Sequence, residues 1–174
     1  MQGLSQFFNA FRMAAVFFSG GQGARAVTAL LMEVTLPTLR VCVPVGTVNV
    51  RKPGDYVAEM IRMAGGQYVP QDLEDNGNAL STINMDMESF YAAAKDADIL
   101  VYNSTIDGEL ERIEQLLQKS SLLADFKAVQ NGDVWCTGQN MFQESMGLGN
   151  MILELHTILA DLDPQGLTYL HRLQ

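Results

Sequence analysis

The stretch that decides the fold lies at residues 56–69 and has the sequence YVAEMIRMAGGQYV. Its apolar residues recur at the spacing i, i+3, i+4 and i+7, which is one face of an amphipathic helix: Val57, Met60, Ile61 and Ala64. Gly65 and Gly66 follow directly and supply the positive-φ position that ends a helix. Tyr68 and Val69 then begin a short apolar run. The stretch therefore predicts a helix, its stop signal and the start of a strand.

The same order of helix and strand recurs downstream. A helical apolar face over residues 87–94 precedes the run ADILVYN at residues 97–103, which is too short for a helix and predicts a buried strand. Asp55 and Asp86 are the expected N-caps of these two helices. Residues 134–136 predict a further strand, and residues 148–162 carry the longest amphipathic face, which Pro164 ends. Alternating helices and strands indicate an α/β protein whose parallel sheet is covered on both faces.

The rest of the chain supplies the remaining predicted elements. Residues 39–45 predict a strand, and residues 46–53 and 70–82 predict loops. Helices are predicted over residues 24–34, over residues 104–117 with Ser104 and Asp107 in a capping-box arrangement, and from about Leu167 to the end. The prediction is a three-layer α/β/α fold with a mainly parallel central sheet of about four strands, plus an N-terminal helical arm.

The predicted arm covers residues 1–37, and the α/β lobe covers residues 38–174. The arm has a helical apolar face that includes Leu4, Phe7, Phe8, Phe11, Ala15 and Phe18. It lacks a basic n-region, an A-x-A cleavage site and an apolar span of membrane length, so we predict neither a signal peptide nor a transmembrane helix. Exposed apolar patches mark interfaces. We therefore expect either a homodimer through the arm or an arm folded on itself.

Composition excludes several classes of function. Of 174 residues, 48% are hydrophobic and 18% are charged, which indicates a globular domain with one sizeable core. The net charge is −9 and the basic residues are scattered, so binding to nucleic acid is disfavoured. Cys42 and Cys136 are expected to be buried free thiols rather than a disulfide. The two histidines, His156 and His171, form no zinc-ligand spacing, so we expect no protein-bound metal and no cofactor.

The sequence also gives little support to catalysis. Neither a G-x-S-x-G elbow nor a Ser/His/Asp arrangement with suitable flanks is present. The glycine-rich residues 20–23 lack the Lys-Ser/Thr of a phosphate-binding loop. His156 lies beside apolar positions of a predicted helix, where a structural role is favoured over that of a general base. We therefore predict that the protein is not an enzyme.

Four blocks of sequence resemble the C-terminal lobe of the class III, helical-backbone substrate-binding proteins of iron-siderophore, haem and cobalamin ABC importers. The blocks are residues 56–69, 87–103, 128–135 (AVQNGDVW) and 149–164, in the family's order and at its spacing. In that family one long helix joins two α/β lobes, and the ligand lies between them. The resemblance therefore implies a truncated protein without its N-terminal lobe, an extracytoplasmic location and an ABC permease as partner. An iron chelate, haem or a cobamide is the implied ligand.

The resemblance also implies a ligand site. Open parallel sheets bind ligands beyond the carboxyl ends of their strands, and in this family the end of the third strand and the loop after the fourth face the cleft. The implied ligand contacts are Asn103, Gln139, Asn140 and Phe142. Arg51 is the cation that would suit an acidic ligand. For each of these residues, the alternative is an ordinary solvated loop position.

Docking to the permease is a further expectation from the resemblance. Family members present an acidic side chain on each lobe to arginines of the permease, and Glu59 is the residue we expect in that role, with Glu74 as a rival. Two other hypotheses stay open. One is an enzyme subdomain of the chelatase type, which needs a cleft histidine paired with a glutamate. The other is a lobe that has lost ligand binding and acts as an interaction module.

Overall fold

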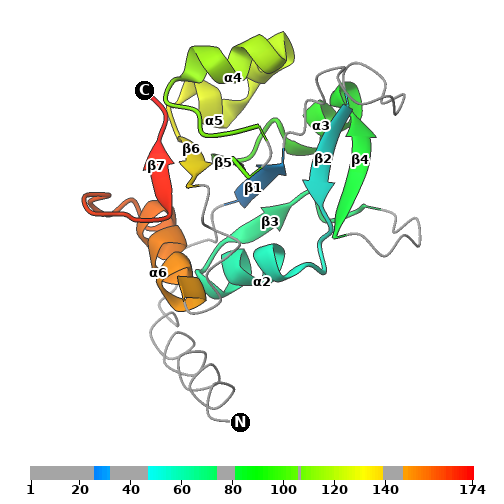
Figure 1. The fold of residues 1–174 in the computed structure, drawn as a ribbon. Helices are drawn as coiled ribbons and strands as arrows, with labels where there is room; N and C mark the ends of the chain where they lie inside the picture. Colours follow the sequence, from blue (N-terminus) through cyan, green and yellow to red (C-terminus); the bar gives the residue numbers. More distant parts are fainter. Residues whose placement is uncertain (1–25, 32–46, 74–80, 106, 139–146) are drawn as a thin grey trace.

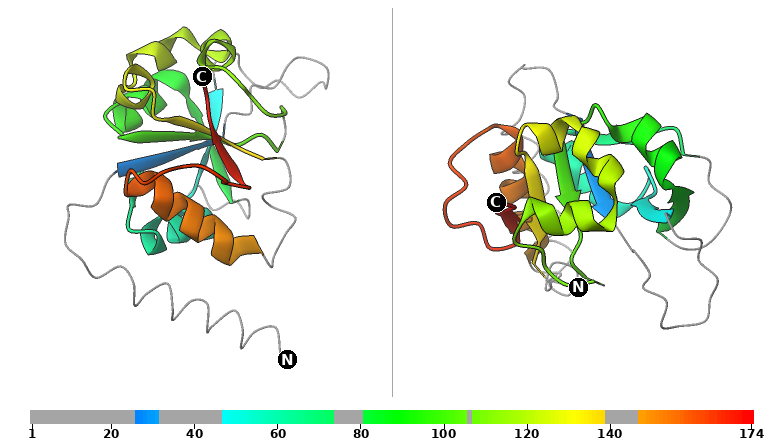
Figure 2. Two further views of the ribbon diagram at one scale, coloured as in Figure 1. Left: turned by 90° about the vertical axis from the view of Figure 1, so that its left-hand side faces the viewer. Right: turned by 90° about the horizontal axis from the view of Figure 1, so that it is seen from above.

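A mixed sheet forms the middle of the molecule and carries helices on both faces (Figures 1 and 2). The structure, a computed structural model, describes residues 26–31, 47–73, 81–105, 107–138 and 147–174. In these residues the sheet has seven strands in the order β4-β2-β1-β5-β6-β7, and β3 also pairs with β1. This arrangement confirms the predicted α/β class.

Four of these strands run in the same direction and form the parallel part of the sheet: β1 (Ala26–Leu31), β3 (Gln67–Val69), β5 (Ile99–Tyr102) and β6 (Val134–Thr137). Three others pair antiparallel with their neighbours: β2 (Thr47–Arg51), β4 (Thr82–Asp86) and β7 (Leu170–Arg172). Because β4 is two antiparallel steps from β1, it runs in the direction of β1. The carboxyl ends of β1, β4, β5 and β6 therefore meet at one edge of the sheet.

The helices lie in two layers. One face carries α2 (Tyr56–Met63) and α6 (Leu148–Leu159), and the other carries α3 (Met87–Ala94), α4 (Ile113–Lys119), α5 (Lys127–Gln130) and the 3-10 helix η1 (Ser121–Asp125) (Figure 2). The predicted caps of α2 and α3 are confirmed. The Asp55 carboxylate accepts a hydrogen bond from Val57 N at 3.5 Å, and that of Asp86 accepts one from Ser89 N at 2.8 Å.

The core is formed by the faces that the helical spacing predicted. Val57, Met60, Ile61 and Ala64 of the α2 segment are all buried. Gly66 allows α6 to approach the end of α2, because a Cβ at this position would lie 3.0 Å from side-chain atoms of both Ile61 and Leu159. On the other face of the sheet, the rings of Phe90 and Phe126 stack with centroids 5.4 Å apart. Trp135 of β6 is buried.

Two strands lie where other structure was predicted. Residues 26–31 form β1, so the helix predicted over residues 24–34 is wrong. A short apolar run has no decisive periodicity, and here β3 and β5 flank its backbone on both sides. Residues 47–51 form β2, not a loop, because Val48 and Val50 alternate with Asn49 and are both buried.

The other two differences have tertiary causes. Helix α4 begins only at Ile113, because the preceding backbone is bonded elsewhere. Leu110 N donates to Cys136 Sγ at 3.4 Å, and Ile113 N donates to the carbonyl of Gln174 at 3.0 Å. The helix predicted from about Leu167 is instead the strand β7, which pairs with β6. These distant partners replace the local hydrogen bonds of a helix.

Some predictions lie outside the described residues. These are the strand over residues 39–45, Cys42, and the helical face of residues 4–18. The division into an arm over residues 1–37 and a lobe over residues 38–174 stays a prediction. Cys136 is a buried free thiol, as predicted.

Candidate functional site

The candidate site lies at the edge where the parallel strands end, because loops and helix N-termini converge there. β5 is followed by Asn103, Ser104 and Thr105, and β6 ends at Thr137 and continues into Gly138. Helices α3 and α6 begin on this side of the sheet, after β4 and β6. Helix α4 begins at the opposite edge, where Ile113 N donates to the Gln174 carbonyl beyond the start of β6. In an α/β fold this is the place where polar side chains from several segments can reach one ligand.

The Asn103 side chain is held by three hydrogen bonds to the same atom. Its Oδ1 accepts one from Thr105 N at 2.9 Å, one from Thr105 Oγ1 at 2.5 Å and one from Thr137 Oγ1 at 3.4 Å. Asn103 is partly exposed and Thr105 is exposed. The amide of Asn103 is therefore oriented by the protein while it remains accessible to solvent.

A hydrogen bond between Ser104 and Thr137 links the end of β5 to the end of β6, next to Asn103. Ser104 is 1% exposed and Thr137 is 2% exposed. Ser104 N donates to Thr137 Oγ1 at 3.0 Å, and the Ser104 carbonyl accepts from Gly108 N at 2.9 Å. Buried polar groups that are satisfied in this way fix the local backbone.

A charged pair covers the other side of the β5 end. Lys119 Nζ lies 3.1 Å from Asp107 Oδ2 and 5.4 Å from the ring centroid of Tyr102. Tyr102 is fully buried, and no hydrogen-bond partner for its hydroxyl is found in the described part of the chain. Burial, followed by the negative charge of Asp107, raises the pKa of Tyr102. Tyr102 is thus a neutral phenol at physiological pH.

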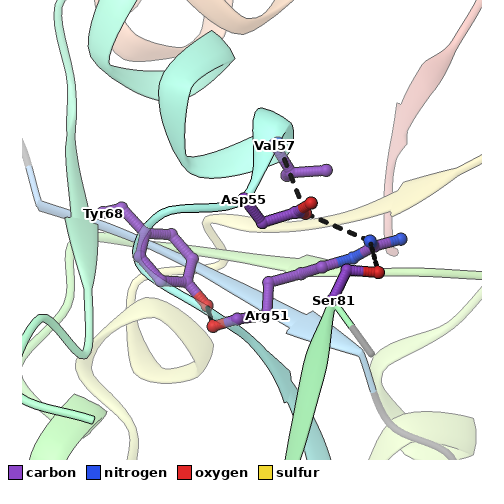
Figure 3. Close-up of polar contacts among 5 residues, drawn as sticks. All are labelled: Arg51, Asp55, Val57, Tyr68 and Ser81. Atoms are coloured by element: carbon purple, nitrogen blue, oxygen red, sulfur yellow. Dashed lines mark hydrogen bonds and ion pairs between the residues drawn. The ribbon is translucent and has the colours of Figure 1, made fainter. Parts of the chain in front are cut away.

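Arg51, the predicted cation, belongs to a different cluster (Figure 3). Its Nη1 lies 3.1 Å from Asp55 Oδ2 and 3.0 Å from Ser81 Oγ, and its guanidinium carbon lies 5.4 Å from the Tyr56 ring centroid. The hydroxyl of Tyr68 donates to the Arg51 carbonyl at 2.7 Å. The Arg51 and Asp55 side chains are only 12% and 7% exposed. The charge of Arg51 is therefore balanced inside the fold.

The sheet register separates Arg51 from Asn103. Arg51 pairs with Thr82 at the start of β4, whereas Thr47 pairs with Asp86 at its end. Arg51 thus lies at the end of the β2–β4 ladder that is remote from the edge where β5 and β6 finish. The structure does not bring these two predicted site residues together.

The other predicted residues are placed less fully. Glu59 lies on α2 and accepts a hydrogen bond from Arg62 Nε at 2.9 Å, and the two side chains are 45% and 68% exposed. This hydrogen bond lowers the pKa of Glu59. Gln139, Asn140, Phe142 and the rival docking residue Glu74 lie outside the described residues.

Sequence reasoning missed Glu154, which organises the segment that follows α6. It is 8% exposed, and its carboxylate accepts hydrogen bonds from Thr168 N at 2.7 Å, Tyr169 N at 2.8 Å and Leu170 N at 3.1 Å. A signal was present, because Glu154 stands next to Leu155 within the predicted apolar face. A carboxylate at such a position needs a buried partner.

Two features are absent from the described residues. No helix there combines the length and the apolar character needed to cross a membrane. In the same part of the chain, no group of three or more His, Cys, Asp or Glu side chains is arranged to hold a metal ion.

The fold is similar to that of known binding proteins. No protein-family model and no curated protein matches the sequence. Among solved structures, an ABC transporter substrate-binding protein from Listeria monocytogenes is similar over 90% of this chain and 55% of its own, with a TM-score of 0.59 and 16% identity. A periplasmic heme-binding protein from Pseudomonas aeruginosa is similar over 99% of this chain and 55% of its own, with a TM-score of 0.62 and 15% identity.

A third similar structure is the siderophore periplasmic binding protein from the fuscachelin gene cluster of Thermobifida fusca. It matches over 91% of this chain and 52% of its own, with a TM-score of 0.59 and 14% identity. The chain thus spans about half the length of these three proteins. At such identities the similarity shows the fold alone.

Proposed function

We propose that the chain is the substrate-binding component of an ABC importer, represented here by one lobe, and that it binds an iron-siderophore, haem or cobamide-type ligand. The observation that carries this proposal is the structural similarity, which covers nearly all of this chain but about half of each binding protein. Those proteins are described as binding siderophore or haem, or as ABC transporter substrate-binding proteins. The sequence resemblance supports the same conclusion from independent features.

The proposed ligand contacts lie at the edge where the parallel strands end. Asn103 is partly exposed there and is oriented by its neighbours, which suits a contact residue. Gln139, Asn140 and Phe142 follow β6 in the sequence and are proposed to act with it. Arg51 stays a prediction as a ligand cation, although its ion pair with Asp55 favours a structural role.

The partners follow from the same proposal. An ABC permease would dock on the lobe, with Glu59 as the proposed acidic contact, because it is exposed on α2. The location would be extracytoplasmic, because an importer takes up its substrate from outside the cytoplasmic membrane. Self-association through residues 1–37 is a further proposal, and light scattering tests it.

The chelatase alternative is less well supported by the described residues. His156 Nδ1 lies 2.9 Å from the Ala64 carbonyl, and His171 Nε2 lies 2.8 Å from the Leu110 carbonyl. Both imidazoles therefore contact backbone carbonyl oxygens, which favours structural roles over that of a general acid or base, since such a group must reach a substrate.

A thermal-shift panel tests the proposed function. The probes are ferric desferrioxamine B, a ferric catecholate, haem and cyanocobalamin, each compared with its iron-free chelator or porphyrin where one exists. A ligand at one hundred times its Kd stabilises the folded state by about 2.7 kcal/mol, which raises the Tm of a domain of this size by roughly 5–10 °C. If none of the four probes shifts the Tm at millimolar concentration, the interaction-module hypothesis replaces this one.

A further inference from the structure

The orientation of the Asn103 amide can be assigned from its partners. The backbone N–H of Thr105 can only donate a hydrogen bond, so the Asn103 atom 2.9 Å from it is the oxygen. The amide nitrogen Nδ2 therefore points away from Thr105. Among the described residues, none accepts a hydrogen bond from Nδ2, although Asn103 is partly exposed. Two N–H donors are thus presented at the strand-end edge.

Thr137 strengthens this orientation from the neighbouring strand. Its Oγ1 accepts the hydrogen bond from Ser104 N at 3.0 Å and lies 3.4 Å from Ser104 Oγ. When the Ser104 hydroxyl donates to it, the Thr137 proton goes to Asn103 Oδ1 at 3.4 Å. Because Thr137 is 2% exposed and sits in β6, its hydroxyl is held by the sheet. A flipped amide would place its N–H₂ against the donors of Thr105 and lose these bonds.

We propose that Asn103 donates hydrogen bonds through Nδ2 to an oxygen atom of the ligand, and that Thr137 is the positioning residue that holds the amide in this orientation. The proposal rests on the proposed function and adds the chemistry of recognition to it. The ligand must present an oxygen acceptor at this point, such as a hydroxamate, catecholate or carboxylate oxygen. Because the amide is oriented before the ligand arrives, binding loses little side-chain entropy there.

The substitution Asn103→Asp tests the donor. It keeps the shape of the side chain and an oxygen for Thr105 and Thr137, but it replaces the N–H₂ group by a second acceptor. We expect the Kd to rise at least tenfold, while the Tm of the free protein changes little. Calorimetric titrations use ferric desferrioxamine B and haem as probes. Asn131→Asp is the matched control, since Asn131 is exposed at the end of α5 and the substitution adds the same charge before the start of β6, at the opposite end of that strand from Thr137.

Thr137→Val and Thr137→Ser test the positioning role. Valine removes the hydroxyl at nearly constant shape, and we expect a several-fold rise in Kd that serine reverses. The NMR relaxation of the Asn103 side-chain N–H₂ should show greater mobility in Thr137→Val than in the wild type, without ligand. Thr157→Val is the control, because that hydroxyl donates to the Leu153 carbonyl within α6, at a partly exposed position. If Thr137→Val does not fold, Thr105→Val removes the other hydroxyl donor from an exposed position and should also raise the Kd.

The outcomes separate the two proposals. If the wild-type chain binds none of the four probes (ferric desferrioxamine B, the ferric catecholate, haem and cyanocobalamin), the proposed function fails, and the role of Asn103 fails with it. If the wild type binds a probe and Asn103→Asp binds it equally well, the function stands and the donor role is overturned. If Asn103→Asp weakens binding but loss of the Thr137 hydroxyl changes neither the Kd nor the mobility of the amide, the positioning role is wrong.

Discussion

The Arg51 cluster and the Asn103 region use polar side chains in opposite ways. In the Arg51 cluster, the guanidinium forms an ion pair with Asp55, donates a hydrogen bond to Ser81 and lies over the ring of Tyr56. Its charge is therefore balanced by a neighbouring carboxylate. In the Asn103 region, the hydrogen bonds of the described residues reach only the oxygen of the amide. The first arrangement joins β2 to the start of α2, and in the second we propose the amide nitrogen as a donor to a ligand.

This difference shows why residue type alone is a poor guide to a binding site. An arginine after a strand suggests an anion site, but a carboxylate four residues later satisfies it. An asparagine is less conspicuous, but none of the hydrogen bonds that Asn103 makes to the described residues uses its amide nitrogen, which is why we propose it as a ligand contact. Whether a polar residue can belong to a binding site depends on which of its hydrogen-bonding groups are already paired within the fold and on the edge of the sheet at which it lies.

The largest expected effect comes from Asp55→Ala. This substitution leaves the nearly buried Arg51 without its carboxylate and removes the N-cap of α2. We expect a loss of about 3 kcal/mol in the free energy of unfolding, measured in urea. The matched control is Glu59→Ala, which breaks an exposed pair and should cost less than about 1 kcal/mol. Equal losses in the two variants would mean that the Arg51 cluster is not a structural pair.

Alkaline pH should weaken the protein through Cys136, near the Asn103 region. Burial raises the pKa of this thiol to about 11 from an ordinary value of 9.0. The folded state therefore keeps the proton that the unfolded state loses, so stability is fully present below about pH 9 and declines as the pH rises towards 11. The loss should reach about 2 kcal/mol.

Urea unfolding of the wild type and of Cys136→Ala between pH 8 and 11 measures this effect. Tyr68 and Tyr102 also have raised pKa values because they are buried, and their ionisation acts in both variants. The difference between the two curves therefore isolates the thiol. A wild-type curve that runs parallel to that of Cys136→Ala would contradict the prediction.

Tyr68→Phe should have a smaller effect in the Arg51 cluster. It removes the hydroxyl that donates to the Arg51 carbonyl and changes little else. A lost buried hydrogen bond of this kind costs about 1–2 kcal/mol, which urea unfolding can resolve. Ligand affinity should be unchanged, because the two regions are separate. A rise in the Kd without a loss of stability would mean that the Arg51 cluster is part of the ligand-binding site.

The smallest effect on stability is expected from Glu59→Gln. Glu59 and Arg62 form an exposed pair on α2, so the free energy of unfolding should change by less than about 0.5 kcal/mol. If Glu59 docks on a permease, transport through the reconstituted importer should nevertheless fall. Unchanged transport would assign docking to another acidic residue, and Glu88, exposed on the first turn of α3, is a suitable comparison.

Much of the fold could be predicted from local sequence. The apolar spacing and the Asp caps located α2 and α3, and short apolar runs located β3, β5 and β6. These signals are local because a helix satisfies its own backbone and shows its buried face at a period of 3.6 residues. Strand β1 was missed because a short run such as AVTALL fits a helix or a strand equally well until its neighbours are known.

The candidate site was less predictable than the fold. Asn103 could be identified as the residue that follows a strand, but Thr137 could not, because its role depends on a neighbour 34 residues away in the sequence. Arg51 was identified by its charge, and only the contacts of that charge show that it is engaged. Residues 139–146, which hold three of the predicted contacts, lie outside the described residues.

The sequence by itself determined the α/β class, the helices α2, α3 and α6, and the caps of α2 and α3, because these depend on local periodicity and on capping residues. Only the tertiary structure decided that β1 is a strand, that residues 107–112 stay out of a helix, and that Arg51 pairs with Asp55 while the described hydrogen bonds of Asn103 reach only its oxygen. The physical reason is that a polar group paired with a distant segment is no longer available for another hydrogen bond. The local sequence pattern does not show which polar groups are paired in this way.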